Sequence, residues 1–108
     1  MLTFVGETGQ TIYAQILGGA VQWWNLTTAA FESYDSANWS AYTIGMTEAG
    51  ASGIYSGPTP ALPNGSYTVV YRRQTGNDAA TNDLAVAAEA LVIGAGARLA
   101  EATVGVAS

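Results

Sequence analysis

Acidic side chains are the residues of this sequence whose chemistry could support catalysis. Glu32 lies three residues before Asp35, and Asp78 lies five residues before Asp83. A pair of carboxylic acids serves as acid and base in glycoside hydrolases, but only in a cleft that fixes their separation. Histidine and cysteine are both absent, which removes the commonest general base, the commonest metal ligand and any cysteine-based metal site. We therefore expect no catalytic residues and no enzyme activity.

The loop GNDAATND, residues 76–83, raises the question of a metal site. Asn77, Asp78, Asn82 and Asp83 carry oxygens of the kind that Ca²⁺ binds, but the regularly spaced acids and final glutamate of an EF-hand are missing. Asn and Asp also favour tight turns, because their side chains hydrogen-bond nearby backbone. The sequence predicts a solvated turn here, with no metal and no cofactor.

The segment 22–42, QWWNLTTAAFESYDSANWSAY, holds all three tryptophans of the chain. Trp23 and Trp24 are adjacent, so on a strand their side chains point to opposite faces, one into the core and one outward or against a partner. Exposed rings beside polar groups would suit a sugar ligand, with Trp24, Tyr34 and Trp39 as the platform. Core and interface packing explains the same rings without any ligand, and we prefer it.

Charge is sparse, at 10% of residues against about 25% in ordinary domains. The net charge is −5, and Arg72, Arg73 and Arg98 are the three cations. This balance argues against nucleic-acid binding, which needs several cationic phosphate contacts, and against an anionic membrane surface. The longest apolar stretch, residues 84–100, is interrupted by Glu89 and Arg98, so no membrane span is expected. A surface this poor in charge is typical of a protein that packs against neighbours.

The elements that would position these residues are short strands. Strand-like runs alternate with turn residues about every ten positions, a pattern typical of an all-β sandwich. The predicted strands lie at 11–17, 20–24, 30–34, 42–47, 53–57 and 66–74. Residues 84–94 are ambiguous, since their alanines favour a helix while Val86, Val92 and Ile93 favour a strand; we expect a strand. The chain is expected to divide into a β-sandwich domain, 1–94, and a C-terminal arm or extra strand, 95–108.

One short motif supports the sandwich. Leu62, Gly65 and Tyr67 have the spacing Leu-x-x-Gly-x-Tyr in LPNGSY. This spacing resembles the tyrosine corner of immunoglobulin-like domains, in which the tyrosine hydroxyl bonds backbone just upstream. The motif predicts a fold corner and indicates nothing about function.

From WWN to VVYRRQTG the sequence resembles a small domain of tailed-bacteriophage virion proteins. The similarity covers roughly residues 10–93 and rests on aromatic and glycine spacing. It includes AFESYDSANWSAY, then YTIGMTEAGASGIYSG, then ALPNGSYTVVYRRQTG. The resemblance implies an immunoglobulin-like antiparallel β-sandwich, here with an extended C-terminal arm, used as a building or decorating part of a virion. It carries over no catalytic residue.

The function expected is that of a non-enzymatic virion structural protein, with a capsid decoration or cement protein first among the possibilities. Its partners would be other virion proteins and copies of itself, with no nucleic acid and no membrane. The predicted contact residues are Trp23, Trp24, Arg72, Arg73, Arg98 and Leu99. The alternatives are a tail or fibre component, a carbohydrate-binding module and the subunit of a helical filament.

Overall fold

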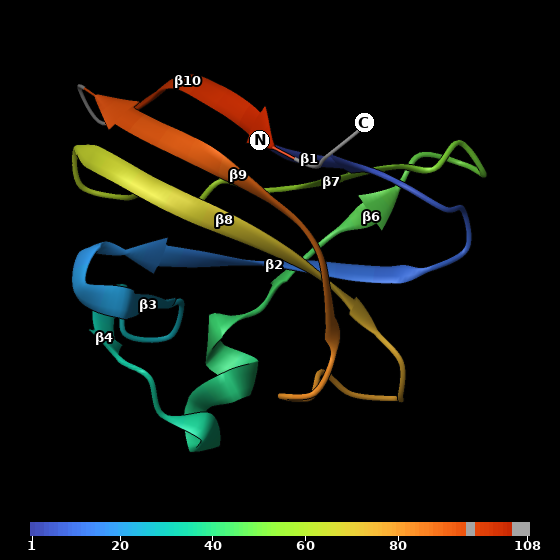
Figure 1. Ribbon diagram of the computed structural model, residues 1–108, viewed down its shortest axis with the longest axis horizontal. Coiled ribbons are helices and arrows are strands. Elements are labelled where there is room, and N and C mark those ends of the chain that lie inside the picture. The colour runs from blue at the N-terminus through green and yellow to red at the C-terminus, as the bar shows by residue number, and fades with distance from the viewer. Residues whose placement is uncertain (95–96, 105–108) are drawn as a thin grey trace.

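The structure is a computed structural model and describes residues 1–94 and 97–104, the latter as backbone (Figure 1). Strands dominate these residues, joined by two short 3-10 helices. In chain order the elements are β1 (Leu2–Val5), β2 (Thr11–Gly18), η1 (Gly19–Val21), β3 (Gln22–Asn25), β4 (Ala30–Ser33), η2 (Ser36–Tyr42), β5 (Ile44–Gly45), β6 (Thr47–Glu48), β7 (Ile54–Gly57), β8 (Gly65–Gln74), β9 (Leu84–Gly94) and β10 (Ala97–Val104).

The strands form two antiparallel sheets. The small sheet has the order β1-β7-β6, and the large sheet has the order β10-β9-β8-β2-β3-β4, with β5 attached to β2. The expected all-β antiparallel architecture is confirmed. The single strand predicted over 42–47 is wrong, because the chain changes sheet there. Ile44–Gly45 pairs with β2 and Thr47–Glu48 pairs with β7, so one run serves both sheets.

Apolar residues from both sheets meet in one core. The rings of Tyr55 and Tyr71 both pack on Phe4, at centroid distances of 5.9 and 5.5 Å. Ile12, Ala14 and Ile16 face this core from β2, as their alternation predicts. The remaining core residues are Leu2, Trp24, Ile44, Leu62, Val69, Leu91 and Ile93. No helix in the described residues is long and apolar enough to cross a bilayer.

The corner motif spans the end of the β7–β8 connection, with Leu62, and the start of β8, with Gly65 and Tyr67. The Tyr67 hydroxyl donates a hydrogen bond to the carbonyl oxygen of Pro63, the kind of bond that the motif predicts. Leu62 is buried in the core, and the Tyr67 ring stacks on Phe31 with centroids 5.3 Å apart. Gly65 has φ +156°, and a Cβ there would lie 3.3 Å from the Tyr67 hydroxyl. Glycine therefore leaves the ring room at the corner.

The C-terminal part of the chain is extended. Residues 84–94 form β9, a strand as expected, paired with β8 along its length. Residues 97–104 form β10, paired with β9 through a bulge between Arg98 and Ala100. Of the two expectations for the end of the chain, an arm or an extra strand, residues 97–104 form the strand, whose pairing satisfies the backbone groups along one side of β9. The rest of the predicted arm, 95–96 and 105–108, lies outside the described residues.

Candidate functional site

The two adjacent tryptophans lie on opposite faces of the large sheet, as the strand geometry predicts. Trp24 is 5% exposed and belongs to the core, where its ring meets Phe31 edge-on at 5.0 Å. Trp23 is half-buried on the outer face. There it joins a second group of rings, called here the aromatic cluster: Tyr13, Trp23, Tyr34, Trp39 and Tyr42.

Helix η2 places the aromatic cluster over the outer face of β2. Asp35 caps the helix, accepting a hydrogen bond of 3.0 Å from the Ala37 amide. Trp39 and Tyr42 turn toward the sheet and are buried. Tyr13 points outward from β2 yet is 3% exposed, because this helix covers it.

The cluster does not form an exposed platform. The Trp23 ring contacts Tyr34, Tyr42 and Trp39, with centroids 5.0, 5.4 and 5.6 Å away. Of the three rings that the glycan interpretation needs, Trp24 is in the core, Trp39 is 6% exposed and Tyr34 alone is open, at 46%. These three rings therefore do not share one accessible surface.

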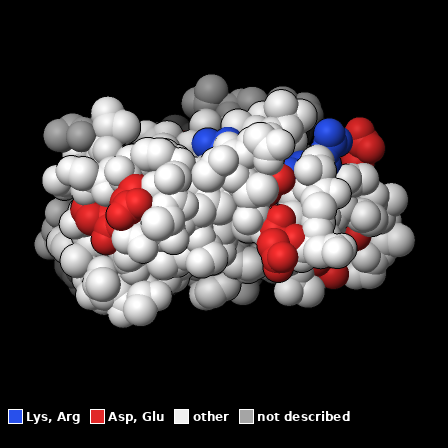
Figure 2. Space-filling view, turned by 90° about the horizontal axis from the view of Figure 1, so that it is seen from below, with Lys and Arg blue, Asp and Glu red and all other residues white. Residues whose placement is uncertain are grey.

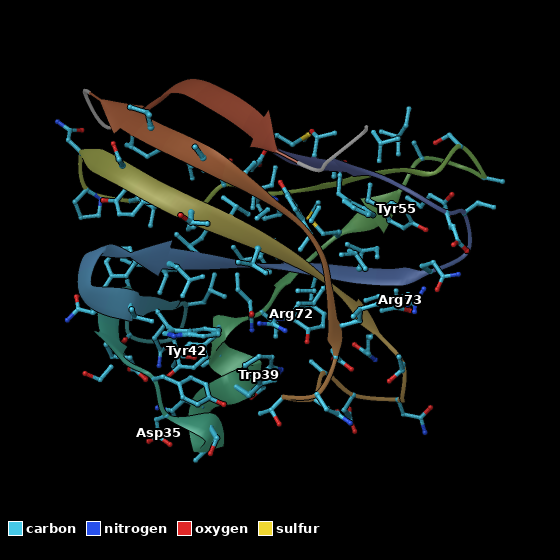
Figure 3. All side chains as sticks on the ribbon, in the orientation of Figure 1. Asp35, Trp39, Tyr42, Tyr55, Arg72 and Arg73 are labelled. Carbon is cyan, nitrogen blue, oxygen red and sulfur yellow. The ribbon has the colours of Figure 1, made fainter. Side chains whose placement is uncertain are left out.

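Arg72 is held within the fold. Its Nε donates to Gln15 Oε1 at 2.7 Å, and one terminal nitrogen donates to the backbone oxygen of Asp83 at 3.0 Å. The guanidinium carbon lies 5.2 Å from the centre of the Trp39 ring, a cation–π contact. Figure 3 shows Arg72 on the side of η2. The predicted contact role of Arg72 therefore competes with three intramolecular contacts.

The other predicted cations differ from Arg72. Arg73 is half-buried and lies away from η2 in Figure 3, with backbone partners Ile12 and Leu84 in the sheet. Arg98 and Leu99 lie in β10, at the bulge of its pairing with β9. The side chains of Arg98 and Leu99 are outside the described part of the structure.

The acids considered for catalysis do not form a pair. Glu32 accepts hydrogen bonds from the Tyr42 hydroxyl at 2.6 Å, from Asn38 at 2.9 Å and from Asn25 at 3.1 Å. These bonds, that of Tyr42 above all, hold the pKa of Glu32 below its usual value. Asp35 caps η2 instead of facing Glu32. Glu32 thus joins β4 to η2.

Asp83 organises the loop after β8. Its carboxylate accepts hydrogen bonds from the Tyr13 hydroxyl at 2.7 Å and the Ala80 amide at 2.8 Å, with Thr75 farther away. Burial raises the pKa of Asp83, but the bonds from Ala80, Tyr13 and Thr75 outweigh it and the net shift is downward. Burial and the bond to Asp83 raise the pKa of Tyr13. The buried Asp83 carboxylate thus fixes the predicted turn, whereas the Asp78 side chain is exposed.

The outer face of the large sheet is uncovered beyond η2. Its residues on β2, β8 and β9 are small or apolar, alternate with core residues and carry no charge. We call this surface the open face: Leu17, Ser66, Thr68, Val70, Ala88, Ala90 and Val92. Two shallow hollows of about 220 and 280 Å³ adjoin Thr68, one toward Leu17 and one toward Ala88.

Charges gather elsewhere on the molecule. Figure 2 views it from the side of η2 and the 75–83 loop, where acidic side chains form separate groups and arginine atoms lie between and beside them. The site residues that the sequence did not point to are Tyr13 and Gln15, buried on the outer face of β2. Outer-face residues of a strand are ordinarily solvated. The burial of Tyr13 follows from its packing against η2, and Gln15 is bonded by Arg72; alternation reveals neither contact.

Comparison of the chain with known protein families, with curated proteins and with solved structures gives no match.

Proposed function

We propose that this chain is a non-enzymatic structural protein of a bacteriophage virion, and specifically a capsid decoration protein with an immunoglobulin-like β-sandwich. The open face carries the proposal. Its residues are uncharged, and no other element among the described residues covers it, so it is available to pack on a neighbouring protein. Binding to assembled neighbours would stabilise a shell by mass action.

The strand order supports the immunoglobulin-like part of the proposal. In a variable-type domain one sheet contains strands B, E and D, and the other has the order G-F-C-C′-C″. The small sheet β1-β7-β6 corresponds to B-E-D, and β9-β8-β2-β3-β4 corresponds to G-F-C-C′-C″. The corner tyrosine, Tyr67, then lies near the start of strand F, where that fold has it. Strand A has no counterpart among the described residues, and β10 is additional.

The side chains considered for catalysis or ligand binding are instead used within the fold, which supports a structural role. Glu32, Asp83 and Arg72 all bond to groups of the same chain. Trp24 and Trp39 are buried. A carbohydrate-binding module remains the second candidate through Tyr34, and a sugar that changes tryptophan emission would favour it. A tail or fibre position would use the same open face.

The experiment is quantitative mass spectrometry of purified virions from the source of the chain. Abundance equal to that of the major capsid protein supports decoration. A few copies per particle would move the chain to the tail or a fibre, and its absence would overturn the virion role.

A substitution tests the open face directly. Thr68→Glu places a carboxylate at its centre and should weaken binding to shells, because burying an unpaired charge is costly. Thr81→Glu makes the same change on the exposed 75–83 loop and should leave binding unchanged. Equal binding by both variants would show that another surface makes the contact.

A further inference from the structure

The two outer strands of the large sheet differ greatly in length. β4 spans Ala30–Ser33, whereas β10 spans Ala97–Val104 and pairs with β9 on one side. Among the described residues no strand pairs with the other side of β10. An edge strand of this length presents a row of backbone donors and acceptors to another chain.

We propose that β10 pairs antiparallel with β10 of a second copy, so that two large sheets become one continuous sheet across a two-fold axis. The sequence of β10, ARLAEATV, is uncharged except for Arg98 and Glu101. If the axis passes between Leu99 and Ala100, Arg98 of each copy stands opposite Glu101 of the other. The strand is therefore complementary in charge to itself in one register.

The bulge of β10 places the positions of Arg98 and Glu101 on the same face of the sheet. Arg98 has Ile93 as its partner on β9, and Glu101 has Leu91. Ile93 and Leu91 are two residues apart and both face the core, so the positions of Arg98 and Glu101 belong to the same face of the sheet. Without the bulge, an interval of three residues would place them on opposite faces. Opposed charges across strands stabilise a pair, and like charges destabilise it.

Pairing of this kind closes on itself. Each copy uses the same strand, so the contact is isologous and ends with a dimer. A filament would instead require β10 of one copy to pair with β4 of the next, which offers half the length. The chain carries a net charge of −5, and β10 contributes one cation and one anion, so this edge brings no excess of like charge together. The dimer does not depend on a place in a virion.

Sedimentation velocity of the purified chain over a dilution series is the test. The wild-type chain should be a reversible dimer. Arg98→Glu and Glu101→Arg should each raise the dissociation constant about tenfold, because each puts two like-charge pairs in the interface. The double variant Arg98→Glu/Glu101→Arg restores opposite charges and should restore the dimer.

Matched controls separate the pairing from a general charge effect. Arg73→Glu and Glu7→Arg make the same changes away from β10 and should dimerise like the wild-type chain; circular dichroism confirms that every variant is folded. A monomer at all concentrations would overturn the proposal. So would a failure of the double variant to recover, or growth into long polymers. A virion lacking the chain would leave this result unaffected.

Discussion

At the scale of single residues, backbone conformation explains two of the glycines. Gly53 has φ +77°, and its carbonyl oxygen accepts a hydrogen bond of 2.9 Å from the Gly6 amide. A Cβ on residue 53 would lie 2.3 Å from the Gly6 carbonyl oxygen, which is backbone and cannot turn aside. Gly9 has nearly the same φ, +78°, but nothing lies within 4 Å of the place that a Cβ would take there. A side chain at residue 9 would meet only the unfavourable backbone conformation, whereas one at residue 53 would also clash with the backbone of Gly6.

Alanine substitution at these glycines should therefore give unequal losses of stability. Gly9→Ala should cost about 1–2 kcal/mol, the cost of a left-handed conformation for an L-residue. Gly53→Ala should cost clearly more, because the backbone of the loop before β2 must also move. Urea denaturation of both variants measures the difference. Equal losses would mean that the backbone around Gly6 moves away from the added Cβ at no measurable cost in free energy.

At the scale of elements, η2 determines which part of the outer face of the large sheet is buried and which part stays exposed. The strand pattern of 11–17 and 66–74 could be predicted from alternation, since these strands are long and turn residues flank them. A loop or short helical turn around Trp39 fits the sequence, but its packing over β2 could not be predicted, because Asp35 as a cap and two inward rings in seven residues give too little periodicity. No strand is predicted for Leu2–Val5, although Leu2 and Phe4 alternate with Thr3 and Val5. Four residues of alternation arise easily by chance.

The corner between β7 and β8 gives an element-scale prediction. Tyr67→Phe removes the hydroxyl that bonds the Pro63 carbonyl but keeps the ring on Phe31, so the free energy of unfolding should fall by about 0.5–1.5 kcal/mol. Tyr34→Phe is the matched control, because the Tyr34 side chain is 46% exposed. Chemical denaturation of both variants measures the effect. An equal fall in the free energy of unfolding of Tyr34→Phe would mean that the hydrogen bond to Pro63 does not account for the effect.

At the scale of the whole molecule, three carboxylates connect separate segments of the chain. Glu32 joins β4 to η2, Asp83 joins the 75–83 loop to β2, and Glu48 joins β6 to the loop between β1 and β2. Glu48 accepts hydrogen bonds from Thr8 at 2.6 Å and from the amides of Gly9 and Gly53 at 3.0 and 2.8 Å. These bonds, that of Thr8 first, lower the pKa of Glu48.

Stability should therefore decline in acid. A carboxyl group whose pKa is lower in the folded state contributes stability that is fully present above its unfolded pKa, about 4. That stability is lost as pH falls through the lowered folded value, where the folded protein takes up the proton. Urea unfolding at a series of pH values should show a decline below about pH 4, and Glu48→Gln should be less stable at neutral pH with a shallower decline.

Glu7→Gln is the control for the acid profile. The Glu7 side chain is exposed, so removing its charge should leave the free energy of unfolding at neutral pH close to that of the wild-type chain. A Glu48→Gln profile as steep as that of the wild-type chain would mean that other carboxylates account for the acid sensitivity.

The whole-molecule arrangement also limits what the sequence can predict of the site. The molecule measures 34 × 32 × 20 Å, so the short axis holds little more than two stacked sheets. Each strand then has one face in the core and one outside unless something covers it. Patterning predicts the inner face, as it does for Ile12 and Val69. It does not predict that η2 covers Tyr13 and leaves Thr68 open, because that depends on where the chain crosses the sheet.

The position of the three arginines makes proteolysis informative. Trypsin cleaves after lysine and arginine, and the cations of this chain are Arg72, Arg73 and Arg98, each within a strand. Cleavage requires an extended, accessible segment, so the intact fold resists trypsin until a strand detaches. In the monomer Arg98 lies in an edge strand, whereas β8 has β9 and β2 on its two sides. The order of cutting therefore reports local opening at β10 first and global unfolding later.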